Sequence, residues 1–172
     1  MRILHAEGLE LEPQREAHAG EMFAVLCDPA LYEYENEPPA SMEWLRERYR
    51  KLESRCSPDG REQWLNWVIR LPSAQLIGYV QATVQPDGRA AIAYVVGSEW
   101  WGRGLASRAV EAMIAELAAN HGAHTVTAVF KRDNHRSRRL LERLGFAPAT
   151  ARLHALVEVE AGESLMQRDL AA

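Results

Sequence analysis

The chain has 172 residues, of which 47% are hydrophobic and 26% are charged, a composition typical of a folded globular protein. The formal net charge of −4 argues against a general binder of nucleic acid or of membrane surfaces, whose phosphates attract basic proteins. Because the sequence has no apolar run of roughly 18 residues and no signal-peptide segment at its start, we expect a cytoplasmic protein with a single domain over residues 1–172.

The first half of the chain predicts short strands, two helices and a group of hairpins. Residues 2–13 alternate and end at a proline, which is typical of one or two short strands. Helical spacing predicts a helix over 14–27, and after a loop a second helix begins at the N-cap Ser41 and runs to about Cys56. Strand-like segments follow at 63–71, 75–84 and 90–97. Short turns rich in Pro, Asp and Gly separate them, so we expect antiparallel pairing.

The second half alternates helices and strands. Residues 104–120 place their apolar side chains on one face of a helix, and the β-branched segment 125–130 predicts a strand. Asn134 is a good N-cap for a helix to Leu144, and Gly145 follows where a left-handed C-cap belongs. Late strands are expected after Phe146 and over 164–170. This order indicates an α+β sandwich, not a doubly wound parallel sheet.

The segment WWGRGLASRAV, residues 100–110, joins a predicted strand to a predicted helix. Backbone N–H groups at a helix N-terminus lack internal partners, and glycine lets an anion approach them closely. Arg103 and Arg108 could add positive charge. The segment is therefore either an anion-binding loop or a tight turn that needs glycine for steric reasons. It lacks the GxxxxGK[ST] of a P-loop and the third glycine of a dinucleotide fold, which makes nucleotide binding a weak alternative.

A second segment, NHRSRRLLERLGF, begins at Asn134 and ends at Phe146. Asn134 and Ser137 stand at the N-cap and N3 positions, so both polar side chains point at the start of the helix. The pair is either a simple capping arrangement or part of a binding site.

Together the two segments resemble the motifs of the GCN5-related N-acetyltransferase (GNAT) superfamily. Trp101-Gly102-Arg103-Gly104-Leu105-Ala106 matches the family loop [Q/R]-x-x-G-x-[G/A], and the segment from Asn134 matches N-x-x-S-x-x-x-L-E-x-x-G-F. Tryptophan replaces the usual Gln or Arg at the first loop position, which is similar to the ribosomal-protein N-terminal acetyltransferase (RimJ/RimL-like) branch. The resemblance covers nearly the whole chain. It implies an α+β fold with a mixed, mainly antiparallel central sheet, helices on both faces and two strands that splay at the cofactor site.

The resemblance implies acetyl-CoA as the acyl donor. Loop N–H groups would hold its pyrophosphate, the exposed backbone of the strand before the loop would pair with the pantetheine amides, and Asn134 would bond the same arm. The implied cofactor-binding residues are Tyr94, Val95, Val96, Trp101, Gly102, Arg103, Gly104, Leu105, Ala106, Asn134 and Ser137. A basic cluster would either meet the 3′-phosphate or form a solvated helix face; it consists of Lys131, Arg132, Arg136, Arg138 and Arg139.

The implied reaction is direct attack of a primary amine on the thioester. Ser137 would stabilise the departing thiolate, and a backbone N–H near Val96 would stabilise the oxygen that gains charge. The base that takes the ammonium proton is predicted to be Glu99. Other candidates for the base are Glu33, Glu35, Glu37, Tyr94 and His154.

No metal site is expected. His121 and His124 lie near a helix end without accompanying acids or thiols, and Cys27 and Cys56 lack metal-ligand spacing, so we expect two reduced thiols.

The acceptor amine is left open between a protein N-terminus and a small molecule. The acidic segment 33–37 favours a cationic acceptor. We expect no nucleic-acid or membrane partner, and a homodimer is an open alternative because strand edges in this fold often pair. A non-catalytic module that binds or senses acyl-CoA is the alternative to an enzyme.

Overall fold

The computed structural model describes residues 1–34 and 36–170. In this part of the chain eight strands form one sheet in the order β1-β2-β3-β4-β5-β6-β8-β7. All neighbouring strands are antiparallel except β5 and β6, which are parallel. The strands are β1 (Leu4–Ala6), β2 (Leu9–Pro13), β3 (Gln63–Arg70), β4 (Leu76–Val84), β5 (Arg89–Val96), β6 (Thr125–Lys131), β7 (Ala147–Pro148) and β8 (Glu163–Asp169). The mixed, mainly antiparallel sheet predicted from the sequence is confirmed.

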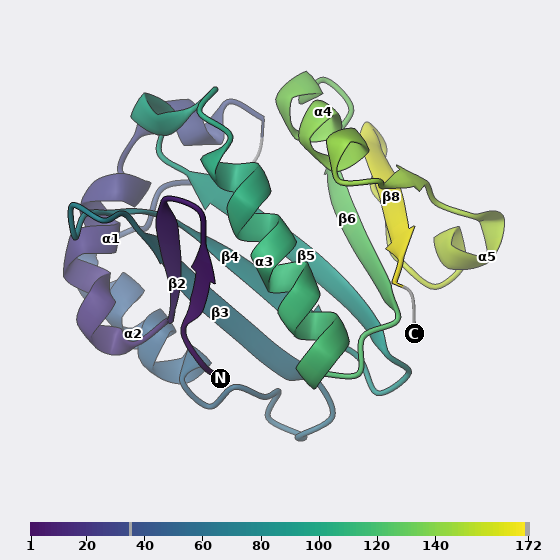
Figure 1. The fold of residues 1–172 in the computed structure, drawn as a ribbon, viewed down its shortest axis with the longest axis horizontal. Helices are drawn as coiled ribbons and strands as arrows, with labels where there is room; N and C mark the ends of the chain where they lie inside the picture. Colours follow the sequence, from purple (N-terminus) through teal and green to yellow (C-terminus); the bar gives the residue numbers. More distant parts are fainter. Residues whose placement is uncertain (35, 171–172) are drawn as a thin grey trace.

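Helices cover both faces of this sheet, as predicted (Figure 1). The helices are α1 (Ala19–Leu26), α2 (Met42–Leu52), α3 (Leu105–Asn120), α4 (His135–Arg143) and α5 (Ala151–His154), with 3-10 turns η1 (Glu16–His18), η2 (Pro29–Tyr32) and η3 (Ser98–Trp100). On one face, α3 and the buried leucines of α4 pack on the larger core. On the other face, α1 and α2 enclose a smaller core around Met22 and Leu45. No helix in the described ranges is long and apolar enough to cross a membrane.

Strands β5 and β6 separate over half of their length. They pair only where Arg89–Ala91 faces Thr125–Thr127, although β5 continues to Val96 and β6 to Lys131. The predicted splay is therefore confirmed. Helix α4 begins just after β6, at the open end of the two strands (Figure 1).

Some element boundaries differ from the prediction. The second helix ends at Leu52 and not near Cys56, because Arg55 adopts a φ of 61° and Cys56 forms a bridge with Gln63. The first helix begins at Ala19 and not at Gln14, whose N–H donates to the carbonyl of a β3 residue instead of starting a helix. The short helix α5 was not predicted.

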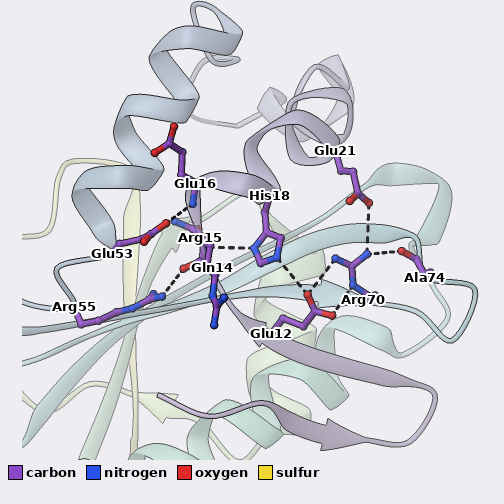
Figure 2. Close-up of polar contacts among 10 residues, drawn as sticks. All are labelled: Glu12, Gln14, Arg15, Glu16, His18, Glu21, Glu53, Arg55, Arg70 and Ala74. Atoms are coloured by element: carbon purple, nitrogen blue, oxygen red, sulfur yellow. Dashed lines mark hydrogen bonds and ion pairs between the residues drawn. The ribbon is translucent and has the colours of Figure 1, made fainter.

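A polar network joins the β2–β3 pair to the start of α1 (Figure 2). Arg70 on β3 donates from Nε to Glu12 on β2 at 2.6 Å, and the side chain of His18 on η1 lies 3.3 Å from the same carboxylate. The hydrogen bond from Arg70 lowers the pKa of Glu12, while burial lowers the pKa of His18. Neutral His18 therefore suits this position, with Nδ1 accepting from the Arg15 N–H at 3.1 Å.

Candidate functional site

A cavity of about 830 Å³ lies where β5 and β6 separate. Its walls come from β5, the loop 97–104, the first turn of α3, β6 and the first turns of α4. The predicted cofactor-binding residues that line it are Tyr94, Val95, Val96, Trp101, Gly102, Gly104, Leu105, Ala106, Asn134 and Ser137. The two remaining predicted site residues, Arg103 and Glu99, are exposed and lie outside its lining.

The loop before α3 leaves the helix N-terminus open. Gly102 and Gly104 have φ of 76° and 73°, which side chains other than glycine rarely adopt. Gly104 is the N-cap of α3, so no side-chain oxygen caps the first turn, and that turn contains no acidic residue. The N–H groups at the start of the helix therefore keep their donors and the positive end of the dipole for an anion. This geometry fits a pyrophosphate.

Two arginine side chains, Arg103 in the loop and Arg108 on α3, brace the loop and lie outside the cavity lining. Arg108 donates to the carbonyl of Arg103 at 3.0 Å and to that of Glu7 at 2.7 Å, which ties the loop to the β1–β2 turn. Arg103 donates to the Glu99 carbonyl at 3.0 Å and lies 4.7 Å from the centre of the Trp100 ring. Positive charge at the site therefore comes from other residues.

The end of β5 presents backbone groups to the opening. The Gly97 N–H donates to the carbonyl of Ile77 on the neighbouring strand β4 at 2.8 Å. Successive residues of a strand direct their N–H and C=O groups to opposite edges. Since the Gly97 N–H points to β4, the N–H and C=O of Val96 point to β6. Pairing with β6 ends at Ala91, so the Val96 N–H has no partner in the sheet on that side. The Val96 carbonyl accepts from Trp101 Nε1 at 2.7 Å.

Trp101 also contacts helix α4 across the opening. The Arg136 guanidinium carbon lies 3.5 Å from the centre of a Trp101 ring, and both residues line the cavity. A guanidinium over an indole face is a favourable cation–π pair. The tryptophan that departs from the family motif therefore links the loop both to β5 and to α4.

Deeper in the cavity, α4 and β5 meet through two hydroxyls. Ser137 Oγ lies 2.6 Å from the Tyr94 hydroxyl, and burial raises the pKa of Tyr94 to about 12. The Ser137 N–H donates to Asn134 Oδ1 at 3.0 Å, so Asn134 is the N-cap as predicted. The cap uses only the side-chain oxygen of Asn134, and its amide hydrogens stay available to a ligand. The capping and binding interpretations are compatible.

The predicted basic cluster divides into two groups. Arg136 and Arg139 line the cavity, together with Arg143. Lys131 instead pairs with Glu163 at 2.8 Å and with Glu160, while the remaining members face other parts of the chain. Arg132 donates to the Glu163 carbonyl, and Arg138 lies over the Phe130 ring. Among the arginines of α4, the split follows the face of the helix that each side chain occupies, whereas Lys131 and Arg132 precede the helix.

The candidate bases lie mostly away from the cavity. Glu33 and Glu37 are exposed and outside its lining, as is His154 at the end of α5. Glu35 lies outside the described residues. Tyr94 does line the cavity, but a pKa of about 12 keeps it protonated at neutral pH, which suits a hydrogen-bond donor and not a base.

Metal-binding side chains do not gather at this site. Within the described ranges, no three His, Cys, Asp or Glu residues lie close enough together to hold a metal ion. His121 instead shares a hydrogen bond with the Gln63 side chain, and His124 with the Asp87 carbonyl.

Several lining residues were missed by the sequence analysis. They include Ala30 and Leu31 on η2, Tyr34 just after it, and His135 and Arg143 on α4. The η2 segment reaches the site because the Asp28 carboxylate accepts from the N–H of Ser98, the first residue of η3, at 3.0 Å. Hydrogen bonding from the Ser98 side chain, and then from this N–H, lowers the pKa of Asp28. Asp28 before Pro29 is a recognisable N-cap, but no local pattern indicates a contact 70 residues away.

Comparisons with known proteins agree with this geometry. Over residues 8–147 the sequence matches the acetyltransferase (GNAT) domain family. None of the curated proteins compared matches it. Among solved structures, it resembles RimL, a ribosomal L7/L12 alpha-N-protein acetyltransferase in complex with coenzyme A, with a TM-score of 0.80 and 17% identity over 98% of both chains.

Two further structures share the fold. The ribosomal-protein-S5-alanine acetyltransferase from Vibrio fischeri has a TM-score of 0.80 and 17% identity, over 97% of this chain and 96% of that one. A chimera of spermidine N-acetyltransferase SpeG from Vibrio cholerae has a TM-score of 0.76 and 18% identity, over 94% and 95% of the two chains. With the family match over most of its length, the chain belongs to the GNAT acetyltransferases, enzymes that use acetyl-CoA as acetyl donor.

Proposed function

We propose that the protein transfers the acetyl group of acetyl-CoA to a primary amine by direct attack on the thioester. The observation that carries this proposal is the alignment of three sets of donors along one cavity: the open N-terminus of α3, the Val96 N–H and the Ser137 hydroxyl. Acetyl-CoA supplies an activated thioester and a leaving thiolate when it is bound. The protein's residues bind, orient and stabilise charge.

Binding uses backbone groups more than side chains. The N–H groups from Gly102 to Ala106 hold the pyrophosphate at the positive end of the α3 dipole. The backbone at the end of β5 accepts the pantetheine arm in the way that a sheet edge accepts an added strand. The Asn134 amide hydrogens donate to the same arm. Arg136 and Arg139 supply positive charge at the cavity wall.

Three groups are proposed to take part in the reaction: the Val96 N–H, the Ser137 hydroxyl and the Glu99 carboxylate. The Val96 N–H donates to the thioester oxygen as charge develops there, and Ser137 donates to the sulfur that leaves. Removing one such preorganised donor costs about 100- to 1000-fold in kcat in other enzymes. Glu99 is the proposed base. It acts through water, because its side chain is exposed on η3, in the loop between β5 and α3, and lies outside the cavity lining.

The acceptor is proposed to be a protein N-terminus or a cationic small amine, as in the RimJ/RimL-like branch. RimL and the S5-alanine enzyme act by name on ribosomal proteins, and SpeG on spermidine. Beside the strand end, Leu31 and Tyr34 give the cavity an apolar and aromatic wall, and the exposed Glu33 and Glu37 flank this segment. An aromatic wall with nearby carboxylates suits a positively charged amine.

The test is a thiol-release screen with acetyl-CoA against peptides that begin with different residues, polyamines, amino acids and aminoglycosides. The proposal expects amine-dependent release of free CoA together with acetylated product. Acetyl-CoA binding without release for any amine would instead favour a module that only binds or senses the donor.

A further inference from the structure

Two neighbouring residues of α4 bridge the opening between the splayed strands. Near the loop Arg136 lies against Trp101, and deeper in the cavity Ser137 Oγ lies 2.6 Å from the Tyr94 hydroxyl of β5. The deeper bridge places two hydroxyls beside the position proposed for the sulfur. The direction of the hydrogen bond between them decides whether Ser137 has a proton to offer.

The phenol is the better donor of the pair. A tyrosine hydroxyl is a far stronger acid than an aliphatic alcohol, even with the pKa of Tyr94 raised to about 12. The other acceptor within reach of Tyr94 is the Ser137 carbonyl at 3.5 Å, a much longer contact than the 2.6 Å to Oγ. The Tyr94 proton therefore lies on the line to Ser137 Oγ.

With its oxygen engaged in this way, Ser137 must direct its own proton elsewhere. Serine in a helix commonly donates to a carbonyl one turn back, but no such bond is present within the described residues. Asn134 Oδ1 accepts from the Ser137 N–H at 3.0 Å, and in the described part of the chain no hydrogen bond joins it to Ser137 Oγ. The remaining direction for the Ser137 proton is the cavity, which this residue lines.

We infer that Tyr94 is a positioning residue, which donates to Ser137 and thereby aims and strengthens the Ser137 hydroxyl as the hydrogen-bond donor to the CoA thiolate. Each member of such a chain polarises the next, so Ser137 donates more strongly than an isolated serine. No bond is made or broken within the pair: Tyr94 stays a phenol, and Ser137 stays an alcohol that stabilises negative charge on sulfur. This inference rests on the proposed function for its place in the reaction.

The test compares binding of CoA with that of desulfo-CoA, which carries the same phosphates but no thiol. Wild-type protein should bind CoA increasingly better than desulfo-CoA as pH rises through the ionisation of the bound thiol. The charged or titratable side chains facing the same cavity are Tyr34, His135, Arg136, Arg139 and Arg143. They are the same in wild-type and variant proteins, so their effect cancels when the CoA preference of a variant is compared with that of the wild type at each pH.

Both Tyr94→Phe and Ser137→Ala should reduce this preference for CoA by about three- to tenfold, the worth of one hydrogen bond. The double variant should lose no more than Ser137→Ala alone. A Tyr94→Phe protein that keeps the wild-type preference overturns the inference, as does a wild type that shows no preference. If Tyr94→Phe does not fold, a ring-fluorinated tyrosine at position 94 replaces it. This more acidic phenol should increase the preference, and an unchanged preference would overturn the inference.

This binding measurement is independent of turnover. A protein that shows the CoA preference but releases no thiol with any amine contradicts the proposed function and leaves the hydrogen-bond chain standing. A protein that turns over while Tyr94→Phe binds and reacts like the wild type contradicts only the chain.

Discussion

Gly78 holds the reactive end of β5 in place, and its replacement by alanine is the sharpest structural perturbation. Gly78 on β4 pairs with Val96. A Cβ on Gly78 would overlap the Val95 carbonyl oxygen and lie 2.9 Å from Val96 Cα, whereas ordinary contact begins at 3.4 Å. Backbone atoms cannot rotate aside as a side chain can, so β5 must retreat by on the order of 1 Å. A displacement of that size at reacting groups costs about 100-fold in rate.

We therefore expect Gly78→Ala to lower kcat/KM by about 100-fold and stability by about 1–3 kcal/mol, the usual cost of overpacking. Steady-state thiol release and thermal unfolding measure the two effects. Gly20→Ala is the control, because a Cβ there meets nothing within 4 Å and the residue lies in α1. Alanine is the better helix former, so this control should match or exceed wild-type stability. A folded Gly78→Ala protein with wild-type kcat/KM would refute this account of β5.

Three further predictions follow from other contacts. Trp101→Phe keeps an aromatic ring beneath Arg136 but removes the hydrogen bond to the Val96 carbonyl. Calorimetry should show that acetyl-CoA binds several-fold more weakly, because one hydrogen bond contributes about 1 kcal/mol. Unchanged binding would contradict the role of the indole N–H. Arg139→Gln should raise the KM for acetyl-CoA about tenfold and leave the KM for the 3′-dephospho donor unchanged, as a contact with the 3′-phosphate requires; an equal rise in KM for both donors would contradict that contact. The folded pKa of His18 lies below its ordinary value of 6.5, so its contribution to stability is present above pH 6.5 and lost as pH falls. Urea unfolding of His18→Asn should therefore lack the wild-type decline between about pH 7 and 5, and an equal decline in both proteins would contradict it.

The parts of the site predicted from the sequence are those built from local backbone geometry. Gly102 and Gly104 need positive φ, and the Asn134 cap spans only three residues, so short motifs carry this information. The hairpins preceding β5 were predictable for the same reason, because alternation and turn chemistry are local signals. Only the resemblance to a family predicted that β5 and β6 pair in parallel and that this pairing ends before the ends of the strands.

The side-chain arrangement could not be predicted, because it depends on contacts between distant segments. Tyr94 and Ser137 are separated by 43 residues, and the bond between them requires β5 and α4 to meet across the opening. The same holds for the arginines of α4, since the face that each one occupies decides whether it reaches the cavity. Nothing in the sequence around Arg108 indicates that its guanidinium binds the carbonyls of Glu7 and Arg103 and not a ligand.

The most direct test of the central claim is the rate of amine-dependent thiol release by wild-type protein and by Ser137→Ala, measured together with the dissociation constant for acetyl-CoA. The account predicts amine-dependent release by the wild type. It also predicts a loss of about 100-fold or more in kcat for Ser137→Ala with acetyl-CoA binding retained. Wild-type protein that releases no thiol with any amine, or a Ser137→Ala protein with unchanged kcat, would contradict it.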